Sequence, residues 1–237
     1  MPWLEAGLDG ATVRFTGRRG GVSQGPFESL NLGILTEDDP EAVVENRHRL
    51  AGAAGFDPER VAMGRQVHGA GLAWQGDPVT APHFARPGDP PPAADGQLTD
   101  LPGLGLLVLV ADCLPVALRG PGGLAMLHCG WRGLAAGIIA AAAARIGADE
   151  AVIGPGIGPC CFEVGPEVTA EFADLGPGLS DGRMLDLPEV AERLLGRAGT
   201  TRVERAGICT WCDEENFFSH RRDRGVTGRQ AGIAWLD

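Results

Sequence analysis

The sequence predicts a layered α/β or α+β fold, a sandwich of helices against a mixed β-sheet. Helix-like and strand-like segments are intermixed without the strict alternation of a TIM barrel or a Rossmann fold. Apolar residues make up 44% and charged residues 22% of the 237 residues, which is typical of a globular protein with a buried core. No repeat of roughly 20–50 residues stands out, which argues against a solenoid.

The helices are predicted from their start signals and from the spacing of apolar residues. In the clearest case Asp39 can cap the helix, Pro40 fits its first turn and Gly55 can close it. The predicted helices are Pro40–Ala54, Leu134–Ile146, Pro166–Leu175 and Pro188–Ala198.

The strands are predicted where short apolar or alternating runs are bounded by glycine, proline or polar residues. They are Thr12–Thr16, Arg60–Val67, Leu104–Ala111, Leu114–Leu118, Leu124–His128, Ala151–Ile153 and Thr201–Cys209. Residues 77–92 are rich in proline, and we expect a surface loop within the domain rather than a linker. Since nothing else resembles a linker, residues 1–237 are expected to form one domain.

The charge balance excludes some classes of partner. All 20 basic residues are arginine, and 31 acidic residues leave a formal net charge of -11. Binding to nucleic acid or to an anionic membrane surface relies on a broad positive surface, so neither partner is expected. A small anionic substrate remains compatible, because a few arginines in one cleft can bind a phosphate whatever the net charge. The sequence does not identify a partner protein.

The expected location is the cytoplasm. The N-terminal residues lack the basic and apolar regions of an export signal, and neither 101–118 nor 134–146 is suited to span a membrane. Without an export signal, cysteines are expected to be reduced thiols or metal ligands rather than a disulfide framework. The six cysteines are Cys113, Cys129, Cys160, Cys161, Cys209 and Cys212.

Three short windows place metal-binding residue types at the ends of predicted strands. They are Gln66-Val67-His68-Gly69, Ala111-Asp112-Cys113 and His128-Cys129-Gly130-Trp131-Arg132-Gly133. The loops at the carboxyl ends of strands usually carry the functional groups of α/β sheets. These windows are therefore the candidate site.

A predicted hairpin can bring two of these windows together. If residues 119–122 form a four-residue loop, Leu118 pairs with Gly123, and Cys113 comes to lie opposite His128. A shift of one residue would instead place Leu114 opposite His128. The register inferred from the sequence is therefore one of two alternatives.

One thiolate and two imidazoles form a suitable zinc ligand set, and three protein ligands leave a fourth position open for catalysis. His68, Cys113 and His128 would supply this set. Spacing alone leaves another interpretation open, in which Cys113 is a buried thiol and the histidines are ordinary loop residues.

The complete windows resemble a known family, in matching order over nearly the whole chain. The matching segments are Arg18-Arg19-Gly20-Gly21-Val22-Ser23, Ser29-Leu30-Asn31-Leu32-Gly33, Gln66-Val67-His68-Gly69, Asp95-Gly96, Ala111-Asp112-Cys113-Leu114-Pro115-Val116, His128-Cys129-Gly130-Trp131-Arg132-Gly133, residues 157–165, Cys209-Thr210, residues 217–222 and residues 227–230. They are similar to the YfiH (DUF152) family, once labelled multicopper polyphenol oxidase laccases. This family is now viewed as zinc-containing purine nucleoside phosphorylases related to mammalian LACC1.

The resemblance implies a fold, a metal and a reaction. The fold would be an α/β sandwich similar to a bacterial toxin deamidase, and zinc would bind His68, Cys113 and His128. The reaction would be phosphorolysis of adenosine, inosine and S-methyl-5′-thioadenosine, with a deaminase activity on adenosine. Cys129 and Cys212 depart from the family pattern, and the pair Cys209 and Cys212 is interpreted as structural.

Candidate substrate-binding residues follow from what phosphorolysis requires. Arg18 with Ser23 in a glycine turn, and Arg132 at a predicted helix start, can bind phosphate. Asn31 can hydrogen-bond ribose or phosphate. Asp112 is a candidate proton carrier beside the catalytic pair Cys113 and His128.

Aromatic and further basic residues are interpreted separately. Trp131, Phe217 and Phe218 are candidates to stack on a purine ring. Arg221, Arg222 and Arg229 are expected to form salt bridges with acidic residues. The partners implied are thus a purine nucleoside and phosphate.

Three alternatives remain at this stage. Cys113 as nucleophile with His128 as base would support an amidase, which could edit peptidoglycan precursors. A copper oxidase is disfavoured because clustered copper sites need more than the five histidines present, so zinc is the expected cofactor and copper the second choice. A zinc site without catalysis is the third alternative.

Overall fold

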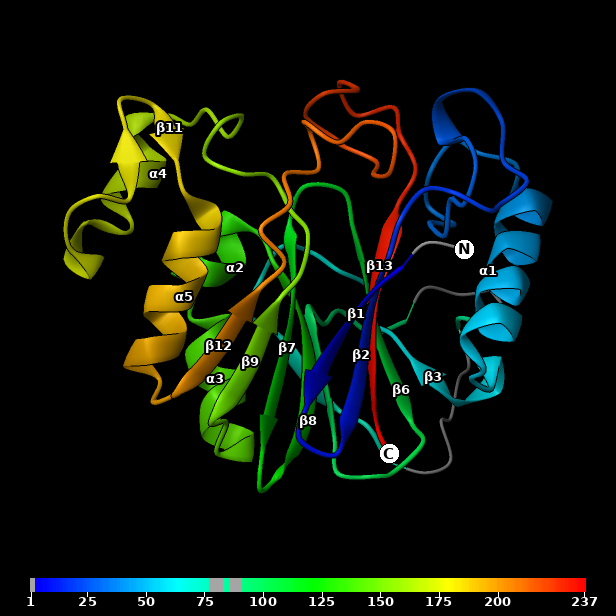
Figure 1. Ribbon diagram of the computed structural model, residues 1–237, viewed down its shortest axis with the longest axis horizontal. Coiled ribbons are helices and arrows are strands. Elements are labelled where there is room, and N and C mark those ends of the chain that lie inside the picture. Colours follow the sequence, from blue (N-terminus) through cyan, green and yellow to red (C-terminus); the bar gives the residue numbers. More distant parts are fainter. Residues whose placement is uncertain (1–2, 77–82, 86–90) are drawn as a thin grey trace.

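The computed structural model describes residues 3–76, 83–85 and 91–237, and its centre is a pair of β-sheets packed face to face (Figure 1). The first sheet has the order β1-β2-β13-β6-β3 and the second the order β12-β9-β7-β8-β5-β4. Most of the predicted loop 77–92 lies outside the described residues, but Phe84 within it is fully buried.

The strands of the two sheets come from distant parts of the chain. The first sheet contains β1 (Trp3–Leu8), β2 (Ala11–Thr16), β3 (Val61–Ala62), β6 (Gly105–Val110) and β13 (Gln230–Leu236). The second contains β4 (Leu72–Trp74), β5 (Gly96–Thr99), β7 (Leu114–Gly120), β8 (Gly123–Cys129), β9 (Glu150–Ile153) and β12 (Arg202–Arg205). A short hairpin of β10 (Ser180–Asp181) and β11 (Met184–Leu185) lies apart from both sheets.

Helices cover the outer face of each sheet. One outer face carries α1 (Pro40–Ala54) and the other carries α2 (Trp131–Ala135), α3 (Ile138–Ile146) and α5 (Leu187–Arg197), so the molecule has four layers (Figure 1). A short helix α4 (Pro166–Ala170) lies beside the β10–β11 hairpin. The predicted α/β sandwich is confirmed, and it contains two mixed sheets where the sequence predicted one. None of the helices within the described ranges is long and apolar enough to cross a membrane.

Side chains of the central strands point alternately to the two faces of each sheet, which explains why both faces of both sheets are buried. In β6, Leu106 and Val108 enter the core between the sheets, whereas Leu107 packs under α1. In β8, Met126 faces the other sheet and Leu127 packs under α3. Successive side chains of a strand point to opposite faces, so an apolar run serves two cores at once.

The predicted hairpin exists, but its register differs from the expected one. A two-residue turn joins Gly120 to Gly123, so Pro115 pairs with His128 and the position of Cys113 is displaced by two residues from direct opposition. The four-residue loop was wrong because the strand pairing continues to the two flanking glycines. A two-residue displacement keeps Cys113 on the same face as His128, since side chains alternate with a period of two.

Several predicted elements are interrupted. Residues 134–146 contain the end of α2 and all of α3, which are separated by Gly137 in a left-handed conformation with φ 84°. The predicted helix 166–175 ends early and continues as a 3₁₀ turn, Ala173–Leu175. The predicted strand 60–67 is reduced to β3, and the residues around His68 form a loop.

Candidate metal centre

Cys113 and His128 lie at one end of the second sheet, on the face turned toward the first sheet. His128 follows Met126 on the same face of β8, and Cys113 packs against the core between the sheets. His68 approaches from the loop that precedes β4. Each of the three side chains can place a ligand atom within 4.8 Å of the others. The structure therefore brings together the three residues that the sequence analysis chose as metal ligands.

Asp95 organises the loop that carries His68. Its fully buried carboxylate accepts backbone N–H hydrogen bonds from Val67 at 3.2 Å, from His68 at 2.9 Å and from Gly69 at 2.9 Å. His68 itself has φ 60°, which is uncommon for a residue with a side chain. Three hydrogen bonds to one carboxylate thus stabilise a backbone conformation that would otherwise be strained.

The same carboxylate orients His128. Asp95 Oδ1 lies 2.8 Å from His128 Nδ1, and the His128 side chain is almost completely buried. A carboxylate that accepts from one imidazole nitrogen leaves the other nitrogen free to ligate a metal, and this pairing is common around metal-bound histidines. Burial alone would raise the pKa of Asp95, but hydrogen bonds from His128 and the loop backbone hold this pKa below its usual value.

Cys113 and His128 form an ion pair when no metal separates them. Burial alone would raise the pKa of the Cys113 thiol, but the charge of His128 and hydrogen bonds from His128 and His68 lower it to about 6. Burial opposes the charged form of His128, but Cys113 and Asp95 raise its pKa to about 9. The pair is a thiolate and an imidazolium near neutral pH. A thiolate is the form that binds metals or acts as a nucleophile.

Gly130 leaves room for the three candidate ligands. A Cβ at this position would lie 3.0 Å from Cys113 Sγ and 3.3 Å from His68 Cδ2. Any side chain would therefore press on two of the three candidate ligands. The glycine keeps the approach to the site open.

Asp112 holds neighbouring loops in place. Its carboxylate accepts hydrogen bonds from the Thr210 hydroxyl and from the Arg221 backbone N–H, both at 2.7 Å. Its backbone carbonyl accepts from Ile157 N–H at 2.8 Å. Asp112 has φ 89°, again in the left-handed region. These contacts fit a residue that positions the adjacent Cys113.

A cavity of about 520 Å³ opens beside the three candidate ligands. Ligand pockets are commonly about 300–1,000 Å³ in volume. Its walls include five arginines, Arg47, Arg65, Arg132, Arg221 and Arg229. Trp131 also lines the cavity, and its ring lies 4.3 Å from the centre of the Arg132 guanidinium. The cavity thus combines a metal-ligand group, positive charge and an aromatic surface.

Two of these arginines were expected to form salt bridges, but they do not bind acids in the described structure. Arg229 donates to the carbonyls of Thr227 and Gly228, and Arg221 donates to the carbonyl of Glu163. Arg222 does pair with an acid, Asp223. Burial lowers the pKa of Arg229, whereas the charges of Cys113 and Asp112 oppose that effect. Arg229 is thus a basic group beside the candidate ligands that the sequence analysis missed.

Arg132 is the predicted phosphate-binding residue that lines the cavity. The Arg18 guanidinium lies elsewhere, on the Phe218 ring, and donates to the carbonyls of Glu28 and Glu214. Ser23 is buried, where its hydroxyl donates to Asp38 and accepts from Asn46. Local hydrogen bonds therefore occupy Arg18 and Ser23.

Asn31 supports the cavity wall from behind. Its amide donates to Thr36 and Asp38, and its carbonyl accepts from the backbone N–H groups of Gly33 and Arg229. Gly33, Thr36 and Arg229 line the cavity, but Asn31 does not. Asn31 thus fixes residues that can contact a ligand.

Two of the three aromatic residues predicted to stack on a purine ring do not reach the cavity. Phe217 and Phe218 are buried core residues, whereas Trp131 lines the cavity and is available for stacking. Cys129 lies on the opposite face of β8 from His128 and is fully buried in the core under α2 and α3. Burial and the charges of Cys113 and Asp95 raise the pKa of the Cys129 thiol. Cys129 therefore lies outside the candidate ligand group.

A comparison with family models decides the relationship of the chain to known proteins. The model described as multi-copper polyphenol oxidoreductase laccase matches residues 12–237. The chain belongs to this family. The laccase-named family includes the proteins called YfiH, which confirms the resemblance found in the sequence.

Similar proteins cover almost the entire chain. Purine nucleoside phosphorylase SCO2081 of Streptomyces coelicolor is 41% identical over 244 residues, which cover 97% of each chain. The crystal structure of YlmD from Geobacillus stearothermophilus superposes with a TM-score of 0.91 at 35% identity, covering 99% of this chain and 96% of the other. The Bacillus licheniformis hypothetical protein YfiH gives a TM-score of 0.89 at 34% identity, covering 97% and 94%. The laccase-named family thus has this four-layer fold.

Proposed function

We propose that the protein is a zinc-dependent purine nucleoside phosphorylase. The observation that carries the proposal is the cavity, which presents a three-ligand metal group and several arginines, among them Arg132, Arg221 and Arg229, to one space. The relatives named purine nucleoside phosphorylase support it, because they match this chain over nearly its full length. We propose adenosine, inosine and S-methyl-5′-thioadenosine as substrates, with phosphate as the second substrate.

His68, Cys113 and His128 are the residues that would hold the zinc ion. Two imidazoles and a thiolate match the ligand preference of zinc, and Asp95 provides the outer hydrogen bond that such histidines usually make. A bound zinc ion supplies a Lewis acid with one open coordination position. The family description mentions copper, but one cysteine and two histidines with a carboxylate partner suit zinc, so copper is the second choice.

The arginines of the cavity provide the anion site that phosphorolysis needs. Arg132, Arg221 and Arg229 can donate several N–H groups to phosphate oxygens. In the reaction a phosphate oxygen forms a bond to C1′ of the ribose while the bond from C1′ to the purine nitrogen breaks. Positive charge on the arginines keeps the phosphate dianion next to the sugar, and Trp131 offers an apolar surface for the base. Asp112 positions Arg221 and Cys113.

A deaminase activity on adenosine is part of the same proposal. It would use the same cavity, with the purine amino group directed toward the metal group. This activity requires only water as co-substrate. An assay without phosphate therefore distinguishes it from phosphorolysis.

A second function is favoured by the ion pair of Cys113 and His128. A thiolate beside an imidazolium is the arrangement of a cysteine nucleophile with its proton carrier, and it would support an amidase acting on peptidoglycan precursors. The two functions make opposite demands on the metal. Zinc on Cys113 blocks the nucleophile, whereas phosphorolysis by our proposal requires the metal.

The decisive experiment incubates protein of measured zinc content with each nucleoside, with and without phosphate. We expect free base and ribose 1-phosphate only when phosphate is present, and loss of this activity after zinc is removed by a chelator. Base release without phosphate would contradict phosphorolysis. Release of an amino acid from a cell-wall precursor by the metal-free protein would instead support the amidase.

A further inference from the structure

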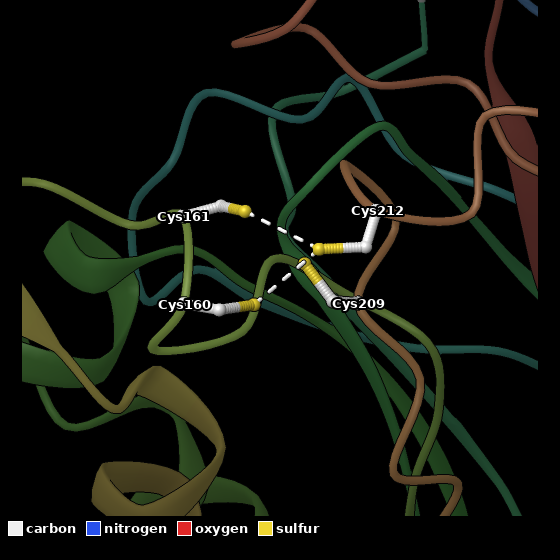
Figure 2. Close-up of side chains that lie close together, drawn as sticks. All are labelled: Cys160, Cys161, Cys209 and Cys212. Atoms are coloured by element: carbon white, nitrogen blue, oxygen red, sulfur yellow. Dashed lines mark hydrogen bonds between the residues drawn. The ribbon is translucent and has the colours of Figure 1, made fainter.

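Four cysteines outside the candidate active site converge near the surface. Cys160 and Cys161 belong to the loop between β9 and α4, and Cys209 and Cys212 belong to the loop after β12 (Figure 2). Their side chains point toward one another, with Cys212 Sγ at 3.5 Å from Cys160 Sγ and 3.4 Å from Cys161 Sγ. All four sulfurs lie within 4.8 Å of one another, and all four are free thiols.

The sheet brings these two loops together. Strands β9 and β12 are parallel neighbours, with Ile153 paired to Arg205 at their ends. The pairing continues beyond the strands, because Gly156 and Cys209 form a parallel bridge and Thr210 N–H donates to the Gly156 carbonyl at 2.9 Å. The convergence of the cysteines is therefore a consequence of the backbone hydrogen bonds of the core.

The turn around Cys209 is suited to a thiolate. Gly158 N–H donates to Cys209 Sγ at 3.2 Å, and the backbone N–H groups of Trp211 and Cys212 also point toward this sulfur. N–H groups directed at a sulfur stabilise negative charge there.

The spacing of the sulfurs fits one tetrahedral ion. A Zn–S bond of about 2.3 Å in a tetrahedral site places sulfurs roughly 3.8 Å apart, within the range that the cluster occupies. We propose that Cys160, Cys161, Cys209 and Cys212 form a second metal site, a four-thiolate zinc site separate from the candidate active site. Four protein ligands leave no open position, so the site is structural. Binding releases the thiol protons to solvent as each thiolate forms.

Arg222 holds the turn that joins Cys209 and Cys212 in place. Arg222 donates to the carbonyls of Thr210 and Trp211, within the turn that joins Cys209 and Cys212, and to the carbonyl of Phe217. Its guanidinium therefore lies directly behind the ligand turn. Asp223 pairs with the same guanidinium at 2.8 Å, so Arg222 acts by fixing the backbone of the turn that carries Cys209 and Cys212.

The second site would fix one wall of the active-site cavity. The cysteines join two loops, and each loop contacts Asp112: Ile157 N–H donates to its carbonyl and the Thr210 hydroxyl donates to its carboxylate. Asp112 directly precedes Cys113. Zinc bound by the four thiolates would therefore stabilise the backbone that places Cys113 opposite His68 and His128.

Cobalt binding tests this proposal without depending on catalysis. The triple variant His68→Ala/Cys113→Ala/His128→Ala lacks the candidate active-site ligands but keeps the four-cysteine cluster. We expect this full-length variant to bind one Co²⁺ per chain with the intense charge-transfer and visible bands of a tetrahedral four-thiolate complex. Wild type would bind a second Co²⁺ with a different spectrum. A triple variant that is folded, as shown by circular dichroism, and binds no Co²⁺ with these bands would overturn the proposal.

A complementary variant keeps the proposal falsifiable if the triple variant fails to fold. Cys160 and Cys212 are exposed, so Cys160→Ser/Cys212→Ser should fold, and Cys129→Ala serves as the control at a buried cysteine outside both groups. Zinc analysis of wild type and of Cys129→Ala should give two ions per chain, whereas the double serine variant should give one. Equal zinc content in all three proteins, or disulfides among the four cysteines in protein purified without reductant, would overturn it.

Discussion

Asp95 binds two of the three candidate metal ligands with a single carboxylate: its Oδ1 contacts both His128 Nδ1, at 2.8 Å, and His68 N–H, at 2.9 Å. The first contact orients an imidazole and the second fixes a backbone conformation with positive φ. The geometry of the candidate metal centre therefore depends on a residue that is not one of its three candidate ligands.

Replacing this carboxylate should weaken metal binding. In Asp95→Asn the amide can accept fewer of the four hydrogen bonds, and it stabilises the ligating form of His128 less well. Changes in such outer partners typically cost about 10–100-fold in metal affinity, and we expect that range for zinc bound at His68, Cys113 and His128. Competition with a chromogenic chelator measures it. Asp100→Asn is the control at an exposed aspartate, and equal zinc affinity in both variants would contradict the role of Asp95.

Enlarging Gly130 should have a similar effect for a steric reason. The Cβ of Gly130→Ala would lie 3.0 Å from Cys113 Sγ and 3.3 Å from His68 Cδ2, so both ligands would have to shift by a few tenths of an ångström. We expect weaker zinc binding at His68, Cys113 and His128 and a lower phosphorolysis activity, while the protein stays folded. Gly196→Ala is the matched control, because a Cβ there meets no atom within 4 Å and alanine should stabilise α5 by roughly 0.5–1 kcal/mol. Normal zinc content in Gly130→Ala would show that the site has more room than we infer.

The arginines of the cavity should determine the affinity for phosphate. Arg229→Ala and Arg132→Ala each remove a charged donor, for which a loss of about 1.5–3 kcal/mol corresponds to a rise in the KM for phosphate of roughly 10–150-fold. The KM for the nucleoside should change less. Arg18→Ala should instead lower the thermal unfolding temperature and leave the KM for phosphate unchanged, because Arg18 binds the carbonyls of Glu28 and Glu214. A rise in KM only in Arg18→Ala would favour the site first predicted from the sequence.

The reactivity of Cys113 in zinc-free protein should depend on pH. Its lowered pKa, about 6, means that the thiolate is present at pH 7 and above and is lost as the pH falls below about 6. Alkylation by iodoacetamide, followed by mass spectrometry of the Cys113 peptide, should therefore stay fast from pH 8 down to about pH 6.5 and then slow. Zinc should protect the thiolate at each pH. A rate that falls tenfold per pH unit below pH 8 would show an unperturbed thiol and contradict the ion pair with His128.

Local signals in the sequence were sufficient for parts of the fold. The helix α1 has the predicted bounds, because Asp39, Pro40 and Gly55 mark its ends. The helix predicted over 134–146 failed at Gly137, whose left-handed conformation depends on how α2 and α3 pack on the sheet. The final strand β13 was missed, although it lies at the centre of the first sheet, because its pairing with β2 and β6 is formed by distant segments.

Cys113 and His128 were found because they lie beside or at the end of strands on the same face of a sheet, whereas His68 lies in a loop and was chosen because its window follows a predicted strand and resembles the family. The predicted hairpin register was wrong by two residues. Because side chains alternate between the two faces of a sheet, a shift of two residues left Cys113 and His128 on the same face. Asp95 was not recognised as a site residue, since its role depends on the approach of the loop around His68. Arg229 and the convergence of the four cysteines likewise depend on contacts between distant segments, which local patterns do not specify.

Diffraction from crystals of the zinc-loaded protein at the zinc absorption edge tests the metal centre most directly. We predict an anomalous peak at roughly 2.0–2.3 Å from Cys113 Sγ and from one ring nitrogen each of His68 and His128, with the fourth position directed into the cavity. A map without a peak between these three side chains would contradict the centre on which the proposed function depends.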